Sequence, residues 1–209
     1  MTDNYQTAGP KEANTYDPGN PSRAVLQRMN RSHAYLRDFA LPLIEWVPEM
    51  RILDVGCGGG ATIADMLALS ENSSIDGVDY SEISVACSRE MNRDFLDGRV
   101  RIFLGNVVDL PFEDEVYDLV TTVESTYFWP DMDKGFSELF RVLKKGGTAA
   151  VINEASDPDA HRDWPDPAGN ITIYRTEELT AFMKKAGFEN IRADHGEGDV
   201  IMVRGTRPE

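Results

Sequence analysis

Acidic residues accompany a glycine-rich turn at the start of the predicted core. Residues 51–60 read RILDVGCGGG, an apolar run that contains Asp54 and then breaks into a turn at Gly56 and Gly58. Because glycine has no Cβ, the backbone can adopt a positive φ there and a ligand can approach it closely. A helical pattern follows the turn, and the next predicted strand ends in Asp79. This arrangement predicts a cradle for a small ligand of the nucleotide kind.

Two classes of ligand fit this cradle. The spacing Gly56-x-Gly58-x-x-Ala61, with Asp79 downstream, satisfies the fingerprint of dinucleotide-binding proteins. Asp54 argues against that interpretation, because a carboxylate near a doubly charged pyrophosphate is repelled. It suits the ammonium group of S-adenosylmethionine, received directly or through water. The backbone of Gly56 and Gly58 would then lie against the methionine portion, and Asp79 would accept both ribose hydroxyls.

Alternating strands and helices position these residues. Apolar runs bounded by turns predict strands near 51–55, 74–79, 100–104, 117–123 and 148–153. Helices are predicted at 61–69, 81–92, 132–143 and 176–187, and glycines 146 and 147 are expected to stop the third of these. Two closing strands, near 188–193 and 200–204, are too close together for a crossover and must form an antiparallel hairpin. The pattern predicts an α/β fold with helices on both faces of a parallel sheet and ligands at the carboxyl ends of its strands.

The chain is predicted to form one domain behind a polar N-terminal segment. Residues 1–21 are polar and contain several prolines, which is typical of a flexible arm. Residues 22–209 have a length common for a single domain. Within them, 22–48 is predicted to be a helical cover that Pro42 kinks or divides. The acidic, proline-rich segment 154–174 is predicted to be a lid-like insertion.

Charge and composition narrow the classes of partner. Asp and Glu number 36 against 21 Lys and Arg, a formal charge of −15, and such a surface repels nucleic acids. No apolar stretch approaches the roughly 20 residues of a membrane span, and the N-terminus lacks the apolar core of a secretory signal. Cys57 and Cys87 make neither a disulfide framework nor a metal site. We therefore expect a cytoplasmic protein without a metal, a nucleic-acid partner or membrane insertion.

Five ordered segments make the sequence similar to a known family. They read ILDVGCGGG, GVDYS, GNVVDLPFEDEVYDLV, LFRVLKKGGTAAV and YRTEELTAFMKKAGF, and they cover most of residues 51–204. The sequence resembles the class I S-adenosylmethionine-dependent methyltransferases, specifically the subgroup of quinone-biosynthesis C-methyltransferases and many small-molecule enzymes. The resemblance implies a Rossmann-like, doubly wound sheet of seven strands, mostly parallel with an antiparallel last strand. It also implies S-adenosyl-L-methionine as the cofactor.

The resemblance places further residues at the cofactor. Asn106 and Val107 should lie beside the adenine, although the family more often has an aspartate at the position of Asn106. Glu124 and Ser125 should line the channel between cofactor and acceptor. Cys57, within the turn, is expected to act mainly as small filler. The complete set expected to contact the cofactor is Asp54, Gly56, Cys57, Gly58, Asp79, Tyr80, Asn106, Val107 and Glu124.

Three residues are candidates for activating a methyl acceptor. His33 falls on the apolar row of the N-terminal helix, where a core histidine is the simpler alternative, and Glu124 and Tyr127 follow the fourth strand. Because the sulfonium already activates the methyl group, the chief task is to align a small-molecule acceptor for in-line attack. An oxygen or carbon acceptor would profit from a base, whereas an amine would need to arrive unprotonated.

Two other functions stay open. A non-catalytic module that binds S-adenosylmethionine and regulates a partner is compatible with the sequence, because no residue is an unmistakable catalyst. Asp54 and the five ordered segments disfavour a dinucleotide-dependent oxidoreductase. A small acceptor is favoured over nucleic acid or protein, because no Asn-Pro-Pro-Tyr type segment follows the fourth strand.

Overall fold

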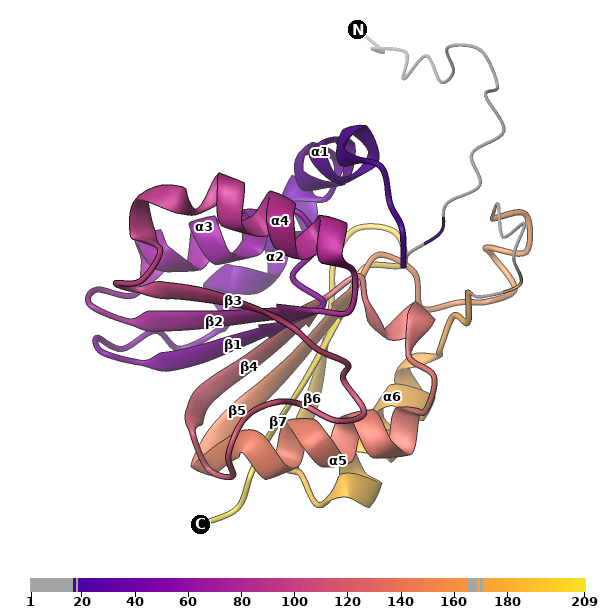
Figure 1. Cartoon of the computed structure of the whole chain (residues 1–209). Coiled ribbons are helices and arrows are strands. Elements are labelled where there is room, and N and C mark those ends of the chain that lie inside the picture. The colour runs from indigo at the N-terminus through magenta and orange to yellow at the C-terminus, as the bar shows by residue number, and fades with distance from the viewer. Residues whose placement is uncertain (1–16, 18, 165–168, 170) are drawn as a thin grey trace, which may run out of the picture.

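One seven-stranded sheet organises the chain, whose computed structural model describes residues 17, 19–164, 169 and 171–209. The strands are β1 (Arg51–Val55), β2 (Ser74–Asp79), β3 (Val100–Leu104), β4 (Tyr117–Val123), β5 (Leu143–Asn153), β6 (Glu189–His195) and β7 (Ile201–Thr206). Their order is β3-β2-β1-β4-β5-β7-β6. Strands β1 to β5 pair in parallel, whereas β7 runs antiparallel to both β5 and β6. The predicted doubly wound sheet with its antiparallel last strand is confirmed (Figure 1).

Helices cover both faces of this sheet. They are α1 (Arg23–Ser32), α2 (Ala34–Ala40), α3 (Ala61–Leu69), α4 (Glu82–Met91), α5 (Met132–Val142) and α6 (Thr176–Ala186), with 3₁₀ turns η1 (Leu41–Leu43), η2 (Arg93–Phe95) and η3 (Thr126–Phe128). Side chains along a strand alternate between the faces, so Ile52 packs with α2, α3 and α4 while Leu53 packs with α5 and α6. Among the described residues, no helix combines the length and apolarity needed to cross a membrane.

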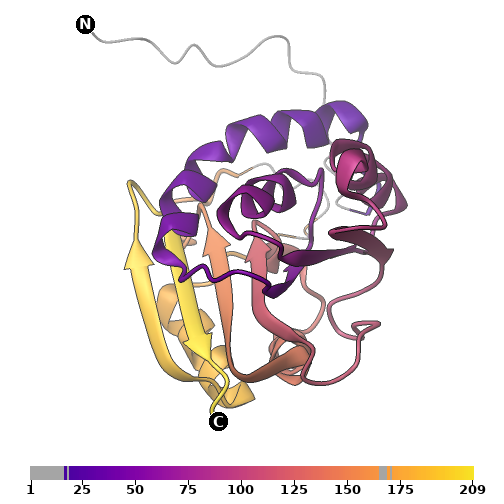
Figure 2. The same cartoon turned by 90° about the vertical axis from the view of Figure 1, so that its left-hand side faces the viewer.

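The predicted helical cover at 22–48 consists of two helices and a 3₁₀ turn. The regular helix ends before Pro42, as expected, because proline lies at the first turn of η1, where its missing N–H is tolerated. A second break, which the sequence did not indicate, occurs at His33 between α1 and α2. Figure 2 shows α1 and α2 crossing over the end of the sheet toward which the parallel strands point.

The end of α5 corrects one prediction. The glycine pair at 146 and 147 does not cap the helix, because Leu143 is already extended and begins β5. Gly146 has a φ of +76°, and its N–H donates to the carbonyl of Arg207 at 2.8 Å. The left-handed glycine therefore belongs to an irregular start of β5, next to a register shift in its pairing with β4.

The two segments predicted to be mobile covers are only partly described. Of the predicted arm 1–21, the structure describes residues 17 and 19–21, and of the predicted lid 154–174 it omits 165–168 and 170. In the described part, Ser156 donates to the carbonyl of Asp199 at 3.0 Å, and His161 contacts the Asp199 carboxylate at 2.9 Å. The segment thus packs on the connection between β6 and β7, and its movement as a lid stays a prediction.

Candidate functional site

The glycine turn lies where the strand order reverses, between β1 and β4. Gly56 and Gly58 have φ angles of +73° and +50°. A Cβ on Gly56 would come within 2.5 Å of the Ser125 Cβ, so the turn approaches the loop after β4 more closely than a side chain allows. The N–H groups of Gly56 and Cys57 donate to the carbonyl of Val78 at 2.8 and 3.1 Å, which ties the turn to β2.

Asp79, the last residue of β2, holds the turn through both of its carboxylate oxygens. The N–H of Gly58 donates to Oδ2 and the N–H of Ser81 donates to Oδ1, each at 2.9 Å. Burial raises the pKa of this carboxyl, while the backbone N–H donors oppose the rise. Each carboxylate oxygen has a further lone pair, so Asp79 keeps the capacity to accept hydrogen bonds from ligand hydroxyls.

A cavity of about 290 Å³ opens between the turn and the α1–α2 cover. It is lined by eight of the nine residues expected at the cofactor: Gly56, Cys57, Gly58, Asp79, Tyr80, Asn106, Val107 and Glu124. His33 also lines it, whereas Asp54 and Tyr127 do not. Lining residues that the sequence analysis did not identify include Met29, Asn30, Arg37, Thr62 and Ser84. An apolar helical row predicts a buried face, but it does not tell a packed core from a cavity wall.

Asp54 belongs to β1, two residues before Gly56, and is buried. Only 2% of the residue is exposed, and its Oδ1 accepts a hydrogen bond from the Thr121 hydroxyl at 2.8 Å. Burial raises the pKa of this carboxyl to about 7, and the charge of Asp79 adds to the rise. The side chain therefore joins β1 to β4, and its contact with a ligand ammonium stays a prediction.

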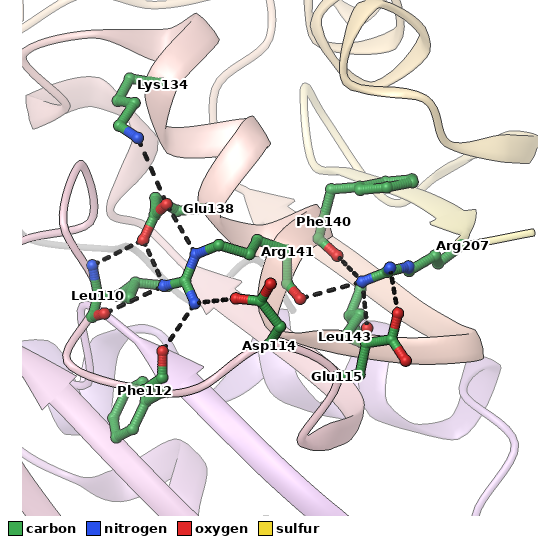
Figure 3. A network of polar contacts seen from close by, with 10 residues as sticks. All are labelled: Leu110, Phe112, Asp114, Glu115, Lys134, Glu138, Phe140, Arg141, Leu143 and Arg207. Atoms are coloured by element: carbon green, nitrogen blue, oxygen red, sulfur yellow. Dashed lines mark hydrogen bonds and ion pairs between the residues drawn. The ribbon is translucent and has the colours of Figure 1, made fainter.

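The loop 105–116, which begins with the two residues expected at the adenine, is fastened to α5. The Oε2 of Glu138 accepts from the N–H of Leu110 at 2.9 Å. Arg141 donates to the carbonyls of Leu110 and Phe112 at 3.1 and 2.7 Å (Figure 3). Arg141 in turn pairs with Glu138 at 2.7 Å. Because these bonds reach backbone atoms, they determine the path of the loop rather than only its side chains.

Asn106 uses its side chain within the same loop. Its Oδ1 accepts from the N–H of Val108 at 3.2 Å, and its carbonyl accepts from the N–H of Asp109 at 3.0 Å. This is an Asx-type turn, which Asn and Asp both favour. The amide oxygen keeps a second lone pair, so an interaction with the adenine amino group remains compatible with the fold.

Glu124 follows β4 with a φ of +56° and points into a polar cluster. Its Oε1 accepts from the N–H of Glu154 at 2.5 Å and from the hydroxyl of Tyr127 at 3.0 Å. Burial, and then the negative charge of Glu154, raise the pKa of the Glu124 carboxyl to about 8. Near neutral pH this carboxyl is therefore largely protonated when no cation is bound.

The two other candidates for acceptor activation differ in access. His33 is half-buried on the cavity wall, and burial lowers the pKa of its imidazole although Glu154 opposes the effect. Tyr127 is 3% exposed, and its hydroxyl oxygen also accepts a hydrogen bond from the N–H of Ala155 at 3.0 Å. Burial raises the pKa of this phenol, so it stays protonated and orients Glu124. His33 and Glu124 are thus brought together at the cavity, with Tyr127 behind them.

Comparison with known proteins finds relatives of this chain. Residues 53–151 match a family model described as a methyltransferase domain. The chain is 30% identical over 161 residues to 24-methylenesterol C-methyltransferase 2 of Oryza sativa subsp. japonica. The matched region covers 72% of this chain and 44% of that protein. The chain is also 30% identical over 142 residues to the uncharacterized methyltransferase YdaC of Bacillus subtilis (strain 168), covering 67% of this chain and 72% of the relative.

A solved structure shows the same architecture. An S-adenosylmethionine-dependent methyltransferase from Thermotoga maritima matches with a TM-score of 0.68 and 25% sequence identity, over 87% of this chain and 93% of that chain. The chain spans less than half the length of the plant sterol and hydroquinone relatives that it matches.

Proposed function

The chain belongs to the class I S-adenosylmethionine-dependent methyltransferases, and we propose that it transfers a methyl group from S-adenosyl-L-methionine to a small-molecule acceptor. The observation that carries the proposal is the cavity of about 290 Å³ at the reversal of strand order, where the glycine turn and Asp79 meet. Plant relatives are named for a sterol and a hydroquinone, which are small acceptors.

The residues of the cavity divide between the two ends of such a reaction. The backbone of Gly56 and Gly58 would hold the methionine portion, Asp79 the ribose hydroxyls, and the loop at 106 and 107 the adenine. The cofactor supplies a methyl group that its sulfonium has already activated. His33, whose pKa burial lowers, is neutral near pH 7 and could accept a proton from an acceptor that approaches beside it.

A cytoplasmic location and the absence of a nucleic-acid partner also belong to this proposal. The formal charge of −15 disfavours binding to a phosphate backbone. Cys57 and Cys87 are both free thiols, as expected in a reducing compartment.

Ligand-dependent stabilisation tests the cofactor assignment. S-adenosylmethionine and S-adenosylhomocysteine should raise the unfolding midpoint, because a ligand at 100 times its Kd stabilises a protein by about 2.7 kcal/mol. A midpoint raised by NAD alone would overturn the proposal in favour of an oxidoreductase. Release of S-adenosylhomocysteine with a panel of phenols, amines and carboxylic acids then measures turnover. Tight cofactor binding with no release across the panel would favour the non-catalytic binding module.

A further inference from the structure

A cluster of one histidine and two glutamates lies at the edge of the cavity, with His33 and Glu124 in its lining. The potential ligand atoms of His33, Glu124 and Glu154 all lie within 4.8 Å of one another. His33 comes from the junction of α1 and α2, Glu124 from the residue after β4, and Glu154 from the residue after β5. Because β4 and β5 are parallel neighbours, their carboxyl ends meet, and the α1–α2 cover supplies the third side chain.

Tyrosine hydroxyls orient both carboxylates of this cluster. Tyr35 donates to Glu154 Oε2 at 2.7 Å, and Tyr127 donates to Glu124 Oε1 at 3.0 Å. Among the residues that the structure describes, no hydrogen bond reaches the second oxygen of either carboxylate or a ring nitrogen of His33. One oxygen of each glutamate is thus held in place while the other stays available. Outer hydrogen bonds of this kind commonly orient the ligands of a metal ion.

The carboxyl groups of the cluster have no basic partner among the residues that the structure describes. Within the described part of the chain, neither Glu124 nor Glu154 forms an ion pair with Lys or Arg. The nearby guanidinium of Arg37 is engaged with Asp65 Oδ2 at 2.6 Å. A carboxyl group that is shielded from water is ionised when it is paired or bound to a metal, and otherwise it keeps its proton. A divalent cation would therefore supply the charge partner that no described Lys or Arg gives these two carboxyl groups.

We propose that His33, Glu124 and Glu154 bind one divalent transition-metal ion of the Mn²⁺ or Zn²⁺ kind. One imidazole nitrogen and two carboxylate oxygens form a mixed donor set, and the imidazole favours these ions over Mg²⁺ and Ca²⁺. Three protein ligands leave coordination positions open, and two of the three residues line the cavity. The sequence analysis predicted no metal because Cys57 and Cys87 do not form a metal site. The proposed ligands are other residues, so this proposal replaces that prediction.

The position of the proposed ion indicates the role that it would have in the reaction. An oxygen atom of an acceptor in the cavity could occupy an open coordination position, where the ion would hold it and lower the pKa of its hydroxyl. This role rests on the proposed methyl transfer, whereas metal binding itself does not depend on it.

A Mn²⁺ titration tests the site directly. The protein, freed of any histidine tag and stripped with a chelator, is titrated with Mn²⁺ while electron paramagnetic resonance measures the free ion. We expect about one Mn²⁺ per chain, and a Kd raised at least about tenfold by Glu154→Gln and by His33→Gln. The matched controls are His195→Gln and Glu197→Gln, which change an exposed histidine and an exposed glutamate and should leave the Kd unchanged.

Two results would overturn the inference. One is the absence of stoichiometric Mn²⁺ binding, together with no change of the unfolding midpoint on adding Zn²⁺. The other is a Kd that neither cluster variant alters. Circular dichroism verifies that each variant is folded, and if Glu154→Gln is not, His33→Gln decides. A midpoint shift by S-adenosylmethionine in chelator without Mn²⁺ binding refutes only the metal site, whereas Mn²⁺ binding without that shift refutes only the proposed cofactor.

Discussion

Replacing Glu124 by glutamine tests how strongly burial and Glu154 act on this carboxyl. Glutamine resembles the protonated form, and its Oε1 can accept the same two hydrogen bonds, from Tyr127 and from the backbone of residue 154. The substitution therefore removes the ionisation of residue 124 while keeping its shape and partners.

The pH dependence follows from the raised pKa. The ordinary pKa of a glutamate carboxyl is 4.5, and the pKa of Glu124 in the folded chain is about 8. Between these two pH values the unfolded chain has released the proton and the folded chain still binds it, so the wild-type protein loses stability as the pH rises. At about 1.4 kcal/mol for each pH unit, the loss at Glu124 reaches about 5 kcal/mol at most above pH 8. Glutamine at position 124 cannot ionise, so the variant avoids this loss of stability.

Urea unfolding in the presence of a chelator, from pH 4.5 to 9, measures this difference. We expect Glu124→Gln to match the wild type near pH 4.5 and to exceed it by about 2–5 kcal/mol at pH 9. Glu197→Gln, on an exposed glutamate, should show no such trend. A difference between Glu124→Gln and the wild type that does not change with pH would refute the reasoning, as would one that shrinks as the pH rises.

Three further substitutions test other parts of the site and its support. Asp79→Asn should weaken S-adenosylmethionine binding in calorimetry by about 10–100-fold, because the ribose loses a charged acceptor, and an unchanged Kd would remove Asp79 from the site. Gly56→Ala should lower the free energy of unfolding by about 1–3 kcal/mol, because its Cβ meets Ser125 at 2.5 Å with φ at +73°. Unaltered urea stability would contradict that clash. Tyr117→Phe removes a buried hydroxyl that donates to Asp76 at 2.8 Å and should cost about 1–2 kcal/mol without changing cofactor affinity. A changed affinity would mean that the substitution reaches the cavity.

Local patterns in the sequence were enough to predict the sheet and to place the glycine turn beside Asp79. The glycines of the turn follow a buried strand directly, and Asp79 ends the next one, so their proximity needs only parallel pairing of β1 and β2. The same locality explains the error at Gly146. A left-handed glycine after a helix suits a helix cap, but here the pairing of β5 with β4 and the bond from Gly146 to Arg207 place it in a strand.

The opposite side of the cavity depends on contacts between distant segments. Neither the spacing of His33, Glu124 and Glu154 nor their residue types predicts that they meet, because no local pattern records the break at His33 or the packing of α1 and α2 over the sheet. Hydrophobic periodicity indicates which face of a helix or strand is buried. It does not determine which side chains of other elements pack against that face, because this depends on the tertiary structure. The sequence alone therefore determined the glycine turn and its acidic partner, Asp79. Only the folded chain decided which charged groups face them, since that choice requires elements far apart in the sequence to pack together.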